Sequence, residues 1–135
     1  MSHALFRPIA GRADEIIDFI MQTEEVRAYP PVSYAVRLAC EEVIVNIIQY
    51  AYPAGADGYI RVNLSVESKR LRIEISDGGI PFNPIDKPLP DITLEAEERE
   101  IGGLGIFLTR QMMDVAEYEY KEGENRLLLI KDIAP

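Results

Sequence analysis

Hydrophobic and polar positions along the chain follow two different periods, and each period predicts a different kind of element. Isoleucines at helical spacing predict a helix over residues 12–24, and a second helix is expected over residues 33–50 with Ser33 as its N-cap. Segments 59–66 and 70–76 instead alternate apolar and polar residues, which is typical of strands with one buried face. The short Glu-Ser-Lys connection between them indicates a hairpin.

The rest of the chain completes the order of elements. Residues 3–10 are predicted to form a short edge strand, the glycine-led segment 102–114 a helix, and segments 115–120 and 126–132 two further strands. The resulting order is β-α-α-β-β-loop-α-β-β. Strands with one apolar face favour an antiparallel sheet covered on one side only. The expected fold class is therefore α+β, a two-layer sandwich of a mostly antiparallel mixed sheet with about three helices on one face, in a single domain over residues 1–135.

The charge balance narrows the class of ligand. The chain has 14 Lys and Arg against 23 Asp and Glu, a net charge of −9, which argues against nonspecific nucleic-acid binding. No apolar run has membrane-spanning length and no signal peptide is visible, so a cytoplasmic location without membrane contact is expected. A single cysteine, Cys40, forms no internal disulfide, and no Cys/His cluster offers a zinc site. An acidic chain that binds phosphate needs backbone dipoles, a metal ion or a few well-placed cations.

One candidate cluster lies on the second predicted helix. At 3.6 residues per turn, Glu42, Asn46 and Gln49 fall within one narrow stripe. A solvated face on an amphipathic helix is the more common explanation of such a stripe. Two features oppose it: the helix is apolar nearly everywhere else, and a carboxylate beside a carboxamide offers the oxygen ligands that Mg²⁺ accepts next to phosphates. The apolar residues of the opposite face are expected to pack on the sheet: Val36, Cys40, Val43, Ile44 and Ile47.

Two glycine-containing stretches form the other candidate clusters. Asp77 ends a predicted strand and is followed by Gly78 and Gly79, so a carboxylate can accept from an exocyclic amine while the glycines let a planar ring approach the backbone. Asp-Gly is also a common turn dipeptide, and taken alone the turn is the better interpretation. The segment 102–105, Gly-Gly-Leu-Gly, opens a predicted helix and can stabilise an anion with backbone N–H groups. A flexible hinge is the alternative, since the segment lacks the Lys-Ser/Thr of a P-loop.

The three clusters together, in this order and over essentially the whole chain, resemble a known superfamily. The chain is similar to the GHKL (Bergerat-fold) ATP-binding proteins and, among them, to the small stand-alone anti-sigma-factor serine kinases of bacterial partner-switching systems. The stretch EEVIVNIIQYAYP resembles the N box, DGGIPFNP the first glycine box and IGGLGIFLTRQMMD the second.

The resemblance implies roles for residues at both ends of a nucleotide. Asn46 corresponds to the Mg²⁺-coordinating asparagine, and Glu42 to the general base or water-polarising residue, which suits phosphoryl transfer because that reaction needs an acceptor for the hydroxyl proton. Asp77 would bind the adenine amino group, and Gly79 would give the ring room. ATP and Mg²⁺ are thus the implied cofactors.

Further roles fall on the long loop and the second glycine box. Residues 83–101 would form the ATP lid, and Arg99 within it is hypothesised to approach the γ-phosphate or a docked partner. The chain lacks a Thr-rich third box, and Asn125 is the candidate for an adenine contact in that part of the chain. The residues expected to line the triphosphate are Gly102, Gly103, Leu104 and Gly105.

The resemblance also implies an activity and partners. The leading hypothesis is an Mg-ATP-dependent serine/threonine protein kinase that phosphorylates a small STAS-type anti-sigma-factor antagonist and sequesters a sigma factor or another regulator, with a homodimer expected from the family. The rival hypothesis is a nucleotide-gated binding module that transfers no phosphate; only Glu42 favours the kinase. A complete sensor histidine kinase is not expected, because the only histidine, His3, lies outside any long helix, and no transducer domain of a gyrase-type machine is expected either.

Overall fold

The computed structural model describes residues 1–8, 12–52, 58–83 and 111–133. Its centre is a five-stranded sheet with the strand order β1-β2-β3-β5-β4. All four pairings between neighbouring strands are antiparallel. The strands are β1 (Ser2–Phe6), β2 (Ile60–Glu67), β3 (Arg70–Asp77), β4 (Val115–Lys121) and β5 (Glu124–Asp132).

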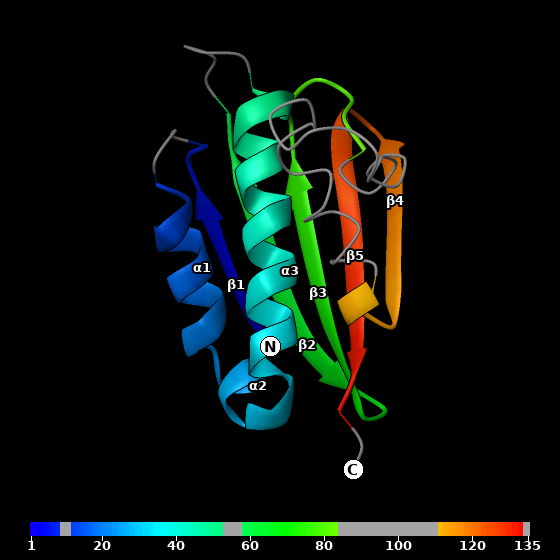
Figure 1. Cartoon of the computed structure of the whole chain (residues 1–135). Coiled ribbons are helices and arrows are strands. Elements are labelled where there is room, and N and C mark those ends of the chain that lie inside the picture. The colour runs from blue at the N-terminus through cyan, green and yellow to red at the C-terminus, as the bar shows by residue number, and fades with distance from the viewer. Residues whose placement is uncertain (9–11, 53–57, 84–110, 134–135) are drawn as a thin grey trace, which may run out of the picture.

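The helices cover one face of this sheet (Figure 1). They are α1 (Ala13–Gln22), the single turn α2 (Glu24–Arg27), a 3₁₀ turn (Pro30–Val32) and α3 (Ser33–Asn46), which continues as a π-helical turn (Ile47–Ala51). The predicted α+β class with a layer of helices on one side of the sheet is confirmed.

The helix predicted from residue 12 to about residue 24 is confirmed as α1, and it ends at Gln22 because Thr23 has an extended backbone and its hydroxyl bonds to the Ile20 carbonyl. One local prediction about the helices is wrong. Ser33 is the first residue of α3 and not its N-cap, because its hydroxyl donates backwards to the carbonyl oxygen of Pro30 at 2.9 Å. The preceding 3₁₀ turn thus leads directly into α3.

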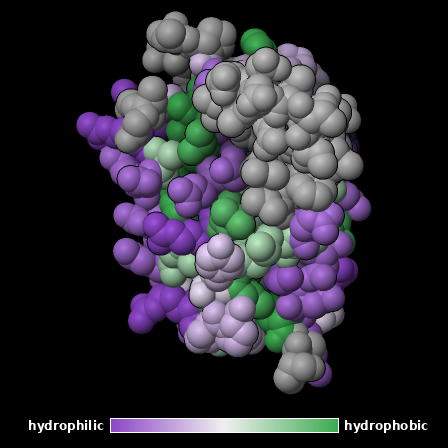
Figure 2. All heavy atoms as spheres, in the orientation of Figure 1, coloured by the Kyte–Doolittle hydropathy of each residue, from purple (hydrophilic) through white to green (hydrophobic). Residues whose placement is uncertain are grey.

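The core lies between the sheet and the helices. Alternation along β3 turns Leu71, Ile73 and Ile75 toward the helices, and all three are buried. The predicted apolar face of α3 packs against this row and is confirmed in full, since the following residues are all buried: Val36, Cys40, Val43, Ile44 and Ile47. On the helix-bearing side of the molecule, hydrophobic residues reach the surface in separate patches between hydrophilic ones (Figure 2).

Two-residue turns connect the hairpins. Ser68 and Lys69 join β2 to β3 with φ values of 52° and 63°, and Glu122 and Gly123 join β4 to β5 with φ values of 55° and 79°. Positive φ at both central positions is the geometry that matches the twist of antiparallel strands. Among the described residues, no helix is long and apolar enough to cross a membrane.

Candidate functional site

Asp77, the last residue of β3, is buried on the helix-facing side of the sheet with only 1% of its surface exposed. It continues the row of Ile73 and Ile75, so the period of the strand places a carboxylate where a hydrophobic residue would otherwise stand. The backbone N–H of Gly79 and the side-chain amide of Asn125 both donate to Oδ1, at 2.9 and 2.8 Å. No described residue donates to Oδ2. Burial raises the pKa of Asp77, although the bond from Asn125 acts in the opposite direction. The predicted strand tip is confirmed, and a bare surface turn is excluded.

Asn125 is the direct cross-strand neighbour of Asp77 and is 3% exposed. It lies in β5, which follows Asp77 in the sequence by 48 residues. The sequence contained an asparagine just after a Gly turn but no signal of which residue it would pair with. The register of β3 with β5 brings it to the carboxylate, and sequence reasoning missed this contact.

The backbone of Gly79, two residues after Asp77, lies close to Ala51 at the end of the π-helical turn. A Cβ at this position would lie 2.3 Å from the carbonyl oxygen of Ala51. The same oxygen accepts the N–H of Ile80 at 2.9 Å, so the loop after β3 is bonded to the continuation of α3. Gly79 therefore provides space for the protein's own backbone; its predicted role toward a base stays a prediction.

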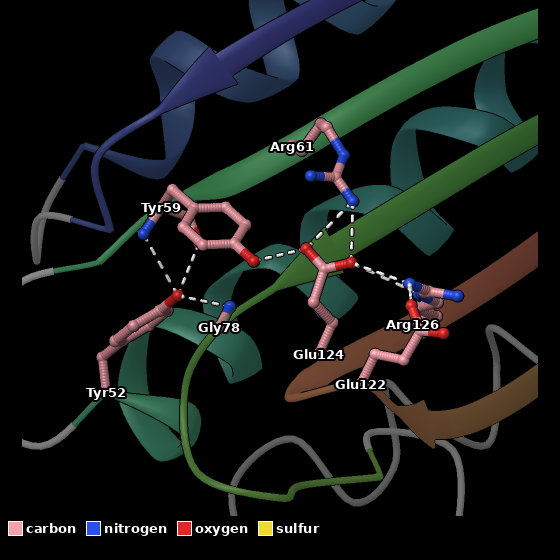
Figure 3. A network of polar contacts seen from close by, with 7 residues as sticks. All are labelled: Tyr52, Tyr59, Arg61, Gly78, Glu122, Glu124 and Arg126. Atoms are coloured by element: carbon pink, nitrogen blue, oxygen red, sulfur yellow. Dashed lines mark hydrogen bonds and ion pairs between the residues drawn. The ribbon is translucent and has the colours of Figure 1, made fainter.

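Tyr52 makes a second connection between the same two segments, and sequence reasoning missed it as well. Its hydroxyl donates to the Tyr59 carbonyl at 2.5 Å and accepts the N–H groups of Tyr59 and Gly78 at 3.1 and 2.8 Å (Figure 3). The hydroxyl thus uses its hydrogen and both lone pairs. The end of the α3 segment, the start of β2 and the end of β3 are consequently joined at one point.

Glu124 connects this point to the opposite face of the sheet. The Tyr59 hydroxyl donates to Glu124, and Arg61 reaches both carboxylate oxygens at 2.9 Å (Figure 3). The bond from Tyr59, followed by the two arginines Arg61 and Arg126, lowers the pKa of Glu124. The same bond raises the pKa of Tyr59 to about 12. At neutral pH the ionised carboxylate of Glu124 and the neutral phenol of Tyr59 therefore link β5 to the start of β2, close to Asp77.

Asn46 is the last residue of α3, at the transition to the π-helical turn. It is 2% exposed, and its Nδ2 has no hydrogen-bond partner in the described part of the chain. An unpaired buried amide is costly, and such positions are often completed by a ligand or water. The predicted polar stripe is only partly formed, because Asn46 is buried, Glu42 is half-buried and Gln49 is exposed.

Glu42 lies one helical turn before Asn46. Burial, and then the neighbouring charge of Glu41, raise the pKa of Glu42. A raised pKa makes a carboxylate a better proton acceptor near neutral pH. The predicted role of Glu42 as the general base stays a prediction.

The other predicted site residues lie outside the described residues. These are Arg99 and the second glycine box, Gly102, Gly103, Leu104 and Gly105, together with all of the predicted lid except Asn83.

The fold and these residues match a known family. Residues 10–131 match the histidine kinase-like ATPase domain, and the chain belongs to this family. The resemblance to GHKL ATP-binding proteins is thereby confirmed.

Curated relatives include bacterial regulatory kinases. The chain is 26% identical to the serine/threonine-protein kinase BtrW of Bordetella bronchiseptica, over 76% of this chain and 72% of that protein. It is 32% identical to the serine-protein kinase RsbW of Listeria monocytogenes, over 64% of this chain and 58% of that protein. It is 25% identical to an anti-sigma F factor of Clostridium beijerinckii, over 71% of this chain and 67% of that protein. The aligned part therefore spans less than two thirds of RsbW.

Among solved structures, the fold is similar to the histidine kinase domain of a blue-light activated histidine kinase from Erythrobacter litoralis. The TM-score is 0.58 at 17% identity, over 90% of this chain and 59% of that one. The Acinetobacter baumannii histidine kinase AdeS gives a TM-score of 0.52 at 12% identity, over 100% of this chain and 69% of that one. These two likenesses concern the fold alone.

The described residues fit a nucleotide accompanied by a hard cation. Oδ2 of Asp77, to which no described residue donates, is a hydrogen-bond acceptor for a base. The carboxamide of Asn46, whose Nδ2 has no partner among the described residues, can present its oxygen instead of its nitrogen after a half-turn. No group of three His, Cys, Asp or Glu side chains in the described ranges could hold a metal ion. A cation here would thus take most of its ligands from phosphates and water, as Mg²⁺ commonly does.

Proposed function

We propose that the chain is an Mg-ATP-dependent serine/threonine protein kinase that acts on a small regulatory protein and also sequesters a regulator. The observation that carries the proposal is Asp77, a buried carboxylate whose Oδ1 is fixed by two donors while Oδ2 has none among the described residues. Because two donors fix Oδ1 in place, the direction of the whole carboxylate is set and Oδ2 can accept a hydrogen bond from a ligand N–H.

Different residues would bind the base and the phosphates of the nucleotide. Asp77 accepts a hydrogen bond from the exocyclic amine of adenine. Asn46 presents its carboxamide oxygen to the cation that accompanies the phosphates. Mg-ATP supplies the phosphoryl group, and Glu42 takes the proton from a serine hydroxyl of the partner protein. The raised pKa of Glu42 supports this last role.

The relatives' names support the choice of substrate class and partner. BtrW and RsbW are named as kinases of serine or of serine and threonine, and the clostridial relative as an anti-sigma factor. For this chain we propose a STAS-type antagonist as the phosphorylated protein and a sigma factor as the sequestered one. Dimerisation stays a prediction.

The test is a phosphate-transfer assay with γ-labelled ATP, Mg²⁺ and a lysate of the organism that encodes the chain. Glu42→Gln is compared with Glu41→Gln, which removes an exposed carboxylate from the neighbouring position of the same helix. We expect one small protein to be labelled on serine by the wild type and by Glu41→Gln, and no label from Glu42→Gln.

ATP binding is measured in parallel for all three proteins. Tight binding without any labelled protein would replace the kinase by a nucleotide-gated binding module. Equal labelling by both variants would remove Glu42 from the mechanism. Absence of ATP binding by the folded wild type would refute the proposal as a whole.

A further inference from the structure

Asn125 uses every hydrogen-bonding position of its side chain inside the protein. Its Nδ2 donates to Asp77 Oδ1 and to the Ile80 carbonyl, both at 2.8 Å. Its Oδ1 accepts the backbone N–H of Phe82 at 2.9 Å and the hydroxyl of Tyr118 at 2.5 Å. A carboxamide offers two donors and two lone pairs, so nothing is left for a ligand.

The backbone partners also decide which way the carboxamide faces. A carbonyl oxygen such as that of Ile80 can only accept, and an N–H such as that of Phe82 can only donate. Rotating the amide of Asn125 by half a turn would turn its oxygen toward the acceptors Asp77 Oδ1 and the Ile80 carbonyl, and its N–H toward the N–H of Phe82. The N–H that faces Asp77 is thus fixed by the loop from Ile80 to Phe82.

We infer that Asn125 is a positioning residue that determines base specificity: it holds Asp77 by Oδ1 as an ionised acceptor and leaves Oδ2 for an exocyclic amine. The inference rests on the proposed function, because it concerns the same nucleotide site. It differs from an adenine contact by Asn125 itself, for which the side chain has no free atom.

Specificity follows from the charge state of Asp77. An ionised carboxylate only accepts, so it attracts the amino group of adenine and repels the carbonyl oxygen that guanine or hypoxanthine carries at the same ring position. A protonated carboxyl could donate to that oxygen, and the discrimination would be lost. Asn125 opposes protonation because its N–H bonds the charged form.

The groups around Asp77 favour its protonated form, so the bond from Asn125 is needed to keep the carboxylate ionised. Burial raises the pKa of the carboxyl, and the charge of Glu124 on β5 acts in the same direction. Arg61 on β2 is bonded to Glu124 and so offsets that charge only in part. The titratable side chains that face Asp77 from the α3 segment and from β4 are the neutral phenols of Tyr52 and Tyr118, whose own pKa values are raised. In the described part of the chain, Asn125 and the Gly79 N–H are the donors that favour the ionised carboxylate.

The experiment compares the wild type with Asn125→Leu, Asn125→Asp and the control Asn63→Leu, which makes the same change on β2, on the sheet face away from the helices. Three quantities are measured. They are the pKa of the Asp77 carboxyl in the nucleotide-free protein by carbon-detected NMR, the Kd of ATP, and the ratio of the Kd of inosine triphosphate to that of ATP.

We expect Asn125→Leu to raise the pKa of Asp77 and to weaken ATP binding by about tenfold to a hundredfold, the loss of one hydrogen bond to a charged group. Asn125→Asp keeps the shape of the side chain, so it serves if the leucine variant does not fold. Two carboxyls at this distance share a proton, and we expect the preference for ATP over inosine triphosphate to fall most in this variant. Asn63→Leu should match the wild type in all three quantities.

The outcomes separate this inference from the proposed function. If the wild type binds ATP and the variants at Asn125 show the wild-type pKa of Asp77 and the wild-type nucleotide ratio, the inference is wrong and the function stands. Weaker ATP binding with an unchanged ratio would mean that Asn125 only supports the fold, and would also overturn it. If the folded wild type binds no ATP, both fail together.

Discussion

Replacing Gly79 by alanine tests whether the loop after β3 is fixed by contact with the α3 segment. The backbone of Gly79 does not have a positive φ, so alanine meets no conformational penalty there. The obstacle is space. The new Cβ would lie 2.3 Å from the Ala51 carbonyl oxygen, 2.8 Å from its carbon and 2.9 Å from its Cβ, whereas ordinary contact begins at 3.4 Å. Backbone on both sides must therefore move apart.

The cost has two parts. Separating the loop from the π-helical turn breaks the bond from the Ile80 N–H to the Ala51 carbonyl, worth about 1 kcal/mol. Overpacking against backbone adds about 1–3 kcal/mol. The sum of about 2–4 kcal/mol is less than the 5–15 kcal/mol that typically separates folded from unfolded domains, so the variant folds. At about 4 °C per kcal/mol for a chain of this length, the Tm should fall by about 8–16 °C.

Gly78→Ala is the matched control. Its Cβ would meet the far end of the Tyr59 ring, at 2.8 Å from the nearest atom, and a side chain can rotate away. We expect it to cost about 1 kcal/mol, mainly from a weakened bond to Glu124. Thermal unfolding and ATP titration of both variants give the comparison. A Tm for Gly79→Ala within about 2 °C of that for Gly78→Ala would refute the reasoning, because the two changes differ only in what the new methyl group meets.

Three further outcomes can be checked. Burial raises the pKa of Asp77 above its value in the unfolded chain, so the ionised carboxylate lowers the stability of the fold at pH values above the folded pKa. This loss of stability disappears as the pH falls through the folded pKa. Asp77→Asn should therefore raise the Tm at pH 7 by about 4 °C, show no such gain at low pH, and abolish ATP binding. Ser68→Asn with Lys69→Gly suits the positive φ values of that turn and should stabilise the protein by about 1 kcal/mol in urea unfolding, with an unchanged Kd for ATP. Cys40 is fully buried and burial raises the pKa of its thiol to about 12, so iodoacetamide should label it only in denaturant; labelling of the native protein would contradict the packing of α3.

Much of the fold and part of the site could be predicted because local patterns determine them. Alternation in β2 and β3 and the apolar face of α3 each depend on residues close in sequence, and all three were correct. Asp77 at the end of β3 followed from the same alternation. Its burial did not, since Asp-Gly is compatible with an exposed turn until the covering helix is in place.

The contacts that complete the site could not be predicted, because they depend on pairing between distant segments. The register of β3 with β5 brings Asn125 to Asp77 across 48 residues. The hydroxyl of Tyr52 reaches Gly78 across 26 residues, and no periodicity encodes such a meeting. The exact end of α1 depends on a different kind of signal, the bond from the Thr23 hydroxyl to the Ile20 carbonyl, which the spacing of apolar residues does not encode.

These long-range contacts have a consequence for how the two ends of the site communicate. Asn46, the predicted phosphate-side residue, and Ala51 belong to one continuous helical segment. Ala51 and Tyr52 are bonded to the loop that follows Asp77. The residues between them form a π-helical turn, a rare geometry that is frequent at functional sites. A change at the base end therefore has a direct mechanical route to Asn46. For this reason Gly79→Ala should weaken binding of ATP and of the free triphosphate alike, whereas Asn125→Leu should weaken ATP alone.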